Sequence, residues 1–273
     1  MKRSKKIWLW SLSTLVGLYI IFALYYYSAQ EKMIFPDTKL PPNYTYQFTG
    51  KFQELNVQCS DGARLNGLLF KSDSSKGVIF YLHGISGNLS KWGKIAKVYT
   101  DLNYDIFFLD YRGYGKSEGE PKNEEQIYGD VQAAYNKLKT IYREKNIVLF
   151  GYSFGTGPAA KLAADNNPKM LVLQAPYYSL LELGKDIHPV LTSLLPTFFF
   201  KYKLKTYESI EHTKVPVIIF HGDNDRTINI DHSYRLKKHF QSGNDTLIVF
   251  KGQDHNGFTE NPVYLSELKR VIH

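Results

Sequence analysis

Residues 151–155 read Gly-Tyr-Ser-Phe-Gly and directly follow the apolar run Ile-Val-Leu-Phe at 147–150. This G-x-S-x-G spacing is typical of a nucleophile elbow, a sharp strand-to-helix turn that leaves the central serine exposed above a sheet. The pattern alone is weak, because three fixed Gly and Ser positions recur by accident in roughly one chain in ten of this length. The small residues at 158–164 suit a helix packed against a sheet. Ser153 is therefore a candidate nucleophile, provided that the chain also supplies its partners.

A serine nucleophile needs a histidine base and a carboxylate that orients the base. In hydrolases with this elbow, the order along the chain is Ser, then Asp or Glu, then His. Two polar clusters follow strand-like runs in that order, at 221–228 and at 252–257. Open α/β sheets place their active sites at the carboxyl ends of strands. We therefore expect Asp225 and His255 to approach Ser153, with Asp223 as the alternative acid.

Two further motifs precede the elbow, Tyr-Leu-His-Gly-Ile-Ser-Gly-Asn at 81–88 and Leu-Asp-Tyr-Arg-Gly-Tyr-Gly-Lys-Ser-Glu-Gly at 109–119. With these five motifs in order, residues 53–273 resemble the α/β-hydrolase superfamily. Within it, they are most similar to the membrane-anchored abhydrolase-domain group of esterases, lysophospholipases and protein depalmitoylases. The resemblance implies an α/β-hydrolase fold, with a mostly parallel sheet of about eight strands, flanking helices and a short lid.

The resemblance also implies a role for each site residue. It assigns Ser153 as the nucleophile, Asp225 as the orienting acid, His255 as the base, and the backbone N–H groups of Ile85 and Phe154 as the oxyanion hole. The sequence departs from the family pattern at 228–229, where Ile-Asn replaces Val-Pro, and at Ile85, where Asn or a small residue is common. Because the oxyanion hole uses backbone N–H groups, neither departure removes a catalytic group.

Other readings of these motifs are weaker. Residues 223–225 resemble the start of a calcium loop, but Ile228 occupies the glycine position and the acidic twelfth residue is missing. Residues 115–117 resemble the end of a phosphate loop, but Asp110 stands where its first glycine should be. A single cysteine, Cys59, excludes an intrachain disulfide and a cysteine zinc cluster. We expect no metal and no cofactor, and we interpret His83 and His221 as structural.

An uncharged apolar stretch at 7–30 lies near the N-terminus and ends at Glu31-Lys32. Four basic residues precede it: Lys2, Arg3, Lys5 and Lys6. About 20 apolar residues cross a bilayer, and aromatic residues mark both ends of this stretch. The alternative is a cleaved signal peptide, which would need a shorter apolar region and a small residue where Tyr27 stands. We predict an uncleaved signal anchor.

The charge distribution predicts how the chain is oriented. The basic residues before the stretch favour a cytoplasmic N-terminus and a catalytic domain on the non-cytoplasmic side. They also supply half of the formal net charge of +8. The remainder is only mildly basic, which argues against nucleic-acid binding and remains compatible with anionic lipid headgroups.

The expected organisation has four parts: a cytoplasmic basic flank at 1–6, a transmembrane signal anchor at 7–30, a juxtamembrane linker at 31–50 and the hydrolase domain at 51–273. The family inserts its lid at about 177–213. This segment is apolar and interrupted by proline, so it could cover an acyl pocket and touch a membrane, or it could be simply packed helix and loop. The oligomeric state is left open.

Together the anchor, the lid and the resemblance predict a serine hydrolase for lipid-like esters or thioesters. Two alternatives stay open: a serine peptidase of the prolyl-aminopeptidase type, and a catalytically silent binding protein on the same fold. The acyl chain length, and the choice between oxygen ester and thioester, are also left open.

Overall fold

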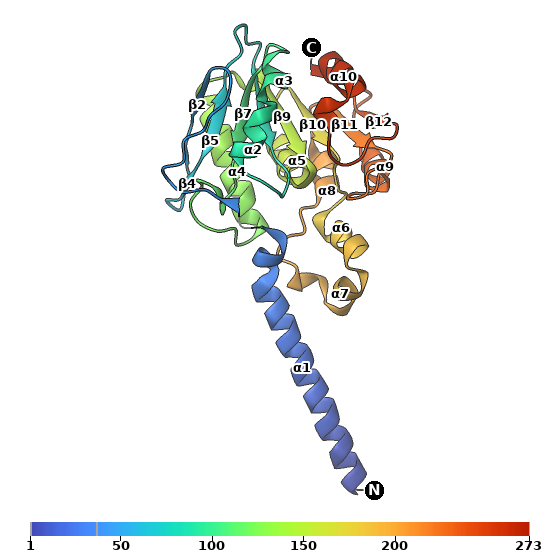
Figure 1. The fold of residues 1–273 in the computed structure, drawn as a ribbon. Helices are drawn as coiled ribbons and strands as arrows, with labels where there is room; N and C mark the ends of the chain where they lie inside the picture. Colours follow the sequence, from blue (N-terminus) through green and yellow to red (C-terminus); the bar gives the residue numbers. More distant parts are fainter. Residues whose placement is uncertain (1, 37, 273) are drawn as a thin grey trace.

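One eight-stranded sheet organises the domain that follows the N-terminal helix, with strands in the order β12-β11-β10-β9-β6-β7-β5-β2. The structure is a computed structural model that describes residues 2–36 and 38–272 (Figure 1). The strands are β2 (Phe52–Glu54), β5 (Gly67–Phe70), β6 (Val78–Leu82), β7 (Asp105–Leu109), β9 (Ile147–Tyr152), β10 (Met170–Gln174), β11 (Val217–Gly222) and β12 (Thr246–Phe250). Strands β12 to β7 are mutually parallel, whereas β5 pairs antiparallel to β7 and β2 antiparallel to β5. The expected mostly parallel α/β-hydrolase sheet is confirmed.

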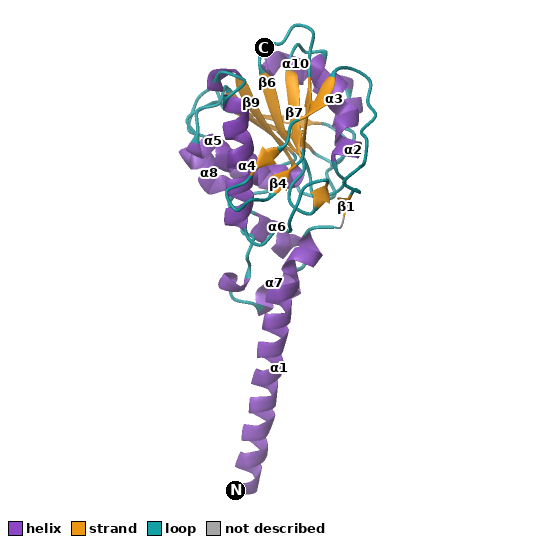
Figure 2. Cartoon of the chain, turned by 90° about the vertical axis from the view of Figure 1, so that its left-hand side faces the viewer, coloured by secondary structure: helices purple, strands orange, loops and turns teal. Residues whose placement is uncertain are grey.

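Helices cover both faces of the sheet, as Figure 2 shows. One face carries α4 (Glu124–Lys139), α5 (Thr156–Asp165), α8 (Thr206–His212) and α9 (Asp231–Lys237), and the other carries α2 (Leu89–Trp92), α3 (Ala96–Thr100) and α10 (Pro262–Ile272). Successive strand side chains point to opposite faces. In β6, Phe80 therefore packs with the first set, while Ile79 and Tyr81 pack with the second. The continuous apolar runs in the sequence reflect burial on both faces.

The sequence pattern predicts strands over 52–59 and 65–70 and a helix over 92–102, and each of these three elements is divided in the structure. The strand predicted over 52–59 divides into β2 and β3 (Val57–Gln58), because β3 turns away to pair with β4 (Arg64–Leu65) in a separate two-stranded sheet. The strand predicted over 65–70 divides for the same reason. The helix predicted over 92–102 becomes α2, a 3-10 turn at Gly93–Ile95 and α3. A Cβ on Gly93 would lie 2.4 Å from the ring of Phe48, so close packing requires glycine at this break.

The predicted transmembrane stretch lies within one long helix, α1 (Lys2–Ile34), which projects away from the domain (Figure 1). Its segment Lys5–Ile34 is long and apolar enough to cross a membrane, and little of it is buried against protein. In the predicted basic flank 1–6, Met1 and the side chains of residues 2–4 lie outside the described part of the chain.

The segment expected to be a linker, 31–50, packs against the domain along much of its length. Helix α1 continues through Ile34, and β1 (Thr38–Lys39) then pairs in parallel with β8 (Tyr114–Gly115). Further along, Phe48 packs edge to face against Phe70 of β5, with ring centroids 5.3 Å apart. Residues 31–50 therefore hold the end of α1 in a fixed position beside the sheet.

The expected lid region contains α6 (Leu180–Ile187), α7 (Pro189–Leu194), a 3-10 turn η4 (Thr197–Phe199) and α8. Helix α8 packs against α5 and belongs to the layer that covers the sheet. The segment from α6 to η4 instead projects beside the domain end of α1 (Figure 1). Ala23 of α1, Leu195 and Phe200 form a small core of their own there.

Candidate active site

Ser153 occupies a strained turn between β9 and α5. Its backbone has φ +51°, in the left-handed region that non-glycine residues rarely adopt. The flanking glycines are required by close approach: a Cβ on Gly155 would lie 2.0 Å from the carbonyl oxygen of Leu82, and one on Gly151 would lie 2.6 Å from that of Gly155. Residues 151–155 thus have the geometry expected of a nucleophile elbow.

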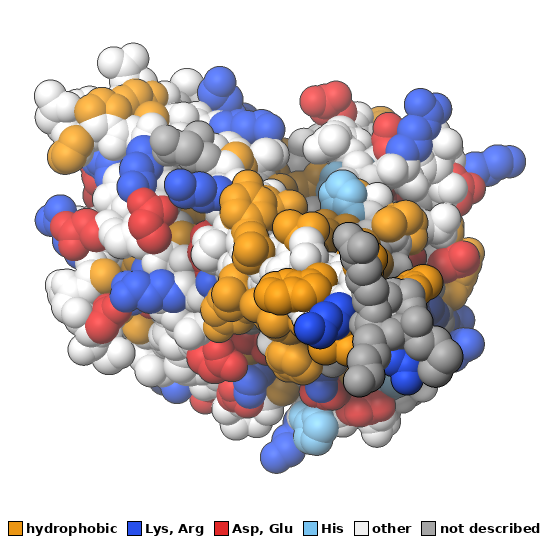
Figure 3. Space-filling model, turned by 90° about the horizontal axis from the view of Figure 1, so that it is seen from below, with side chains coloured by type: hydrophobic (Ala, Val, Ile, Leu, Met, Phe, Trp, Pro, Cys, Tyr) orange, Lys and Arg blue, Asp and Glu red, His pale blue; other side chains and the backbone are white. Residues whose placement is uncertain are grey.

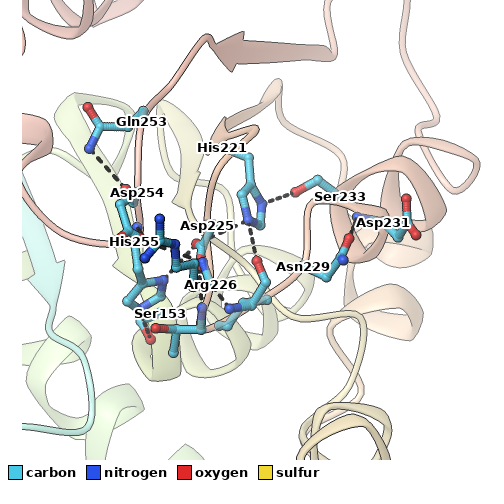
Figure 4. A network of polar contacts seen from close by, with 12 residues as sticks. Ser153, His221, Asp225, Arg226, Asn229, Asp231, Ser233, Gln253, Asp254 and His255 are labelled. Atoms are coloured by element: carbon cyan, nitrogen blue, oxygen red, sulfur yellow. Dashed lines mark hydrogen bonds and ion pairs between the residues drawn. The ribbon is translucent and has the colours of Figure 1, made fainter.

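The structure brings Ser153, His255 and Asp225 together in one chain of hydrogen bonds (Figure 4). His255 Nε2 lies 3.0 Å from Ser153 Oγ, and His255 Nδ1 lies 2.7 Å from Asp225 Oδ2. The three residues follow the carboxyl ends of β9, β12 and β11. Because an ionised carboxylate only accepts hydrogen bonds, it favours the proton on Nδ1 and leaves Nε2 free to accept from the serine hydroxyl.

The Asp225 carboxylate is buried and accepts several hydrogen bonds. Its Oδ1 accepts hydrogen bonds from the backbone N–H groups of Thr227 and Ile228, both at 2.8 Å. Burial alone raises the pKa of Asp225, but hydrogen bonds from His221 and His255 outweigh it and hold that pKa well below its usual range. The carboxylate is therefore ionised at neutral pH.

His221 holds the loop that presents Asp225, in keeping with its predicted structural role. Its Nδ1 lies 2.6 Å from Ser233 Oγ, and its Nε2 lies 2.9 Å from the carbonyl oxygen of Ile228 and 3.3 Å from Asp225 Oδ2. The sequence placed His221 near the site, but not its contact with the carboxylate. The His221 ring therefore helps to orient the same Asp225 oxygen that lies 2.7 Å from His255 Nδ1.

The other two aspartates of the site are bound to backbone. Asp223 Oδ1 accepts a hydrogen bond of 2.6 Å from the N–H of Gly252. Asp254 Oδ1 accepts from the N–H of His255 at 2.7 Å and from that of Arg226 at 3.2 Å. Of the two candidate acids, only Asp225 reaches the His255 ring.

The two backbone N–H groups expected to form the oxyanion hole lie on loops beside Ser153. Phe154 is buried in the 3-10 turn that precedes α5, where the first N–H groups have no partner within the helix. A Cβ on Gly84 would lie 3.4 Å from Ser153 Cβ, so the loop that carries Ile85 runs next to the serine. Within residues 2–36 and 38–272, neither N–H donates to another loop, strand or side chain.

Comparisons with known proteins agree with this fold and site. Residues 73–213 match the family described as Serine aminopeptidase, S33. The chain is 30% identical over 223 residues to human alpha/beta hydrolase domain-containing protein 17B, covering 79% of this chain and 73% of the relative. The chain belongs to the α/β-hydrolase superfamily. Its relatives place this hydrolase in the abhydrolase-domain group, as the motifs indicated.

Further relatives of this α/β hydrolase vary in coverage. Alpha/beta hydrolase domain-containing protein 17C of Xenopus laevis is 30% identical over 222 residues, or 79% of this chain, but the match spans only 64% of that relative. An esterase of Pyrococcus furiosus has a TM-score of 0.66 at 19% identity, with 87% of this chain and 97% of that one covered. An acetyl xylan esterase of Paenibacillus has a TM-score of 0.64 at 16% identity, with 84% of this chain and 86% of that chain covered. At these identities the two structures show a shared fold.

Tyr152 is a member of the hydrolase site that the sequence reading missed. Its hydroxyl lies 3.1 Å from the carbonyl oxygen of His255 and 3.0 Å from Asn256 Oδ1, so it ties the elbow strand to the loop that carries His255. The position is the first variable residue of G-x-S-x-G, and the motif therefore gives no signal for it.

A buried pair supports the loop of this hydrolase that carries Ile85. His83 Nε2 lies 3.3 Å from Asp110 Oδ1, with both side chains fully buried. Burial raises the pKa of Asp110, and the neighbouring His83 opposes that rise. The Tyr111 hydroxyl donates to the carbonyl oxygen of His83 at 3.0 Å.

Within the described residues, no group of three His, Cys, Asp or Glu side chains is arranged to hold a metal ion.

Proposed function

We propose that this hydrolase is membrane-anchored and cleaves carboxylic ester or thioester bonds of lipid-like acyl substrates through an acyl-enzyme. One observation carries the proposal: the continuous contact from Asp225 through His255 to Ser153 at the carboxyl edge of the sheet. A hydroxyl within reach of an oriented, unprotonated imidazole nitrogen is the arrangement needed for nucleophilic acyl transfer.

The catalytic cycle follows from this geometry. His255 Nε2 removes the proton from Ser153 Oγ as the oxygen attacks the acyl carbonyl carbon. The N–H groups of Ile85 and Phe154 stabilise the oxyanion, and protonated His255 donates its proton to the departing oxygen or sulfur, which leaves as the alcohol or thiol. Water then attacks the acyl-enzyme with His255 again as base, which releases the acid and restores the serine. Ionised Asp225 keeps the imidazole in the required tautomer throughout.

Apolar surfaces beside the elbow support a lipid-like substrate. A cavity of about 210 Å³ lies between α1 and α6–α7, with a largely apolar lining that includes Ile34, Leu183 and Tyr202. The ring of Phe35 packs edge to face on Tyr202, at 5.1 Å between centroids, and on Phe154, at 5.5 Å. Phe35 and Tyr202 therefore lie between this cavity and Phe154 of the elbow, and we propose that the cavity holds the acyl chain.

Helix α1 and its flanking charges support the anchor and its orientation. We infer that α1 spans the membrane uncleaved, with residues 1–6 in the cytoplasm and the catalytic domain on the non-cytoplasmic side. In sealed vesicles from expressing cells, a tag placed after the C-terminus should be digested by protease only from the non-cytoplasmic side. If protease on the non-cytoplasmic side left the tag intact, the orientation would be the opposite of the one proposed, and the proposed chemistry would be unchanged.

The catalytic proposal is tested with the full chain in phospholipid nanodiscs. A fluorophosphonate probe should label Ser153, and Ser153→Ala should abolish labelling while the fold is retained. Ser74→Ala, which alters an exposed serine in a surface loop, is the matched control and should label normally. Acyl p-nitrophenyl esters and acyl thioesters of graded chain length then define the substrate. Full hydrolysis by folded Ser153→Ala would refute the assignment.

The family description Serine aminopeptidase, S33 favours a second candidate, a serine peptidase acting on substrates with a free amino group. The same Ser153-based mechanism serves an amide bond, so substrate choice decides between the two. Aminoacyl arylamides should therefore be assayed beside the esters. A kcat/KM higher for an aminoacyl arylamide than for every ester and thioester would establish the peptidase instead.

A further inference from the structure

The α7–η4 segment meets α1 near the middle of its uncharged stretch. The hydroxyl of Tyr19 donates a hydrogen bond of 3.0 Å to the carbonyl oxygen of Leu194, the last residue of α7. Only about 18 Å of helix separates Ile7 from Tyr19, at about 1.5 Å per residue. The hydrocarbon core of a bilayer is about 30 Å thick. If α1 spans the membrane, the core extends past Tyr19 to the level where protein lies beside the helix.

Further contacts hold the segment from α7 to Phe200 against α1 between Tyr19 and the domain. Tyr26 packs edge to face on Phe200, with centroids 5.5 Å apart, and Tyr27 does so on Phe199, at 6.5 Å. One turn further along, Gln30 Nε2 donates to the carbonyl oxygen of Phe199 at 2.7 Å. The segment therefore lies alongside α1 over about three turns.

Residues 187–200 contain no Asp, Glu, Lys or Arg, and their polar side chains are those of His188, Thr192, Ser193 and Thr197. Four of the segment's large apolar side chains are between 53% and 71% exposed: Ile187, Val190, Leu194 and Phe198. Figure 3, which looks along α1 toward the domain, shows hydrophobic side chains gathered around this end of the molecule. Exposed apolar clusters of this kind mark protein or membrane contacts.

Charged groups appear at the domain end of the segment. Lys201 pairs with Glu31 of α1 at 2.9 Å, and its ammonium group lies over the ring of Tyr27. Lys32 follows on α1. This change from uncharged to charged occurs at the same level on α1 and on the lid, as expected where hydrocarbon gives way to headgroups.

We propose that residues 187–200, comprising α7 and η4, are embedded among the acyl chains of the leaflet nearest the catalytic domain, alongside α1. The proposal rests on the proposed membrane anchor. Its occupant is lipid rather than a second copy or another protein, because the exposed apolar face continues the lipid-facing surface of α1 at the same depth. The carboxyl edge of the sheet, with Ser153, is thereby held against the membrane, and the cavity between α1 and α6–α7 lies next to the bilayer.

Depth measurements on nitroxide-labelled protein test the proposal. In a Cys59→Ala background, single labels are introduced by Phe198→Cys and, as a second position, Val190→Cys. Leu12→Cys in α1 reports on the anchor, and Ile141→Cys reports on an exposed apolar residue at the opposite edge of the sheet, near the start of β7. Each full chain is reconstituted in phosphatidylcholine vesicles, checked for folding by circular dichroism, and exposed to oxygen or to a water-soluble nickel chelate.

Labels at 198 and 190 should collide several times more often with oxygen than with the chelate, as the label at 12 should, whereas the label at 141 should show the reverse. If the labels at 198 and 190 behave like the label at 141 while the label at 12 is in lipid, the embedding is wrong and the anchor stands. Protection of 198 and 190 from both reagents would reveal a protein partner and also overturn the proposal. A label at 12 exposed to the chelate would refute the anchor and the embedding together.

Discussion

Phe35, the first residue after α1, packs edge to face on Phe154, the residue that follows the elbow serine, with ring centroids 5.5 Å apart. The same Phe154 contributes a proposed oxyanion N–H. The end of the long helix is therefore in direct contact with the elbow rather than joined to the domain by a free tether. The position of α1 and the surroundings of the proposed nucleophile are linked through this pair of rings.

Removal of either the proposed nucleophile or the proposed base should abolish most catalysis. Ser153→Ala and His255→Ala should each lower kcat by roughly 10⁴-fold or more, and the double variant should be little worse, because the two residues act as a unit. The measurement is steady-state hydrolysis of the best ester found in the substrate screen. Independent, multiplying losses in the double variant would contradict a shared catalytic step.

The two aspartates of the loop after β11 should differ sharply. Asp225→Asn should lower kcat on the order of 10⁴-fold, because the amide no longer holds the proton on His255 Nδ1. Asp223→Asn, which alters a carboxylate bound to the Gly252 N–H, is the matched control and should retain most activity. We would abandon Asp225 as the orienting acid if Asp223→Asn were the less active of two folded variants.

Tyr152→Phe tests the link between the elbow and the loop that carries His255. The change removes one hydroxyl and keeps the ring, so stability should fall by about 1 kcal/mol, the usual contribution of one hydrogen bond. The His255 loop loses a support, so kcat should also fall, with KM little changed. Thermal unfolding and ester kinetics provide the two measurements. Wild-type kcat in a measurably destabilised variant would show that the hydroxyl serves the fold alone.

Arg112 should reveal the difference between a buried and an exposed ion pair. Its guanidinium contacts the buried carboxylate of Asp130 and the half-exposed one of Asp61, both at 2.7 Å. Asp130→Ala should lower the free energy of unfolding by up to about 3–5 kcal/mol, because it removes the buried partner of Arg112 and leaves that buried charge paired with Asp61 alone. Asp61→Ala should cause a clearly smaller loss. Equal destabilisation, measured by denaturation in detergent, would mean that burial does not decide the strength of this pair.

Asp225 should make stability depend on pH in a defined direction. Its pKa is depressed in the folded state, so its contribution is present above the unfolded value, about 3.9, and is lost as pH falls through the folded value. The wild type should thus be more stable than Asp225→Asn at pH 7, and this advantage should shrink on acidification well below pH 4. Thermal unfolding of both proteins across that range is the measurement. If the stability difference between the wild type and Asp225→Asn grew as the pH fell, the folded-state pKa of Asp225 would be raised rather than lowered.

Local patterns allowed much of the fold and site to be predicted from the sequence. The strands that the sequence predicts over 78–82 and 105–109 coincide with β6 and β7 to the residue, because burial on both faces leaves a continuous signal. The strand predicted over 246–250 coincides with β12, which lies at the edge of the sheet and is only partly buried. The order of the motifs singled out Ser153, Asp225 and His255, since their spacing reflects which strand ends meet at one edge of the sheet.

Only the tertiary structure decided which groups touch. The hydrogen bond from Ser153 to His255 joins residues 102 positions apart, and the contact of His221 with Asp225 depends on how one loop folds back on itself. The support from Tyr152 and the packing of residues 31–50 carry no motif. The sequence also did not predict that η4 lies beside α1. An apolar run indicates only that a segment is removed from water, because the hydrophobic effect is non-directional. Which surface covers the segment depends on parts of the chain that are distant in sequence and adjacent in space.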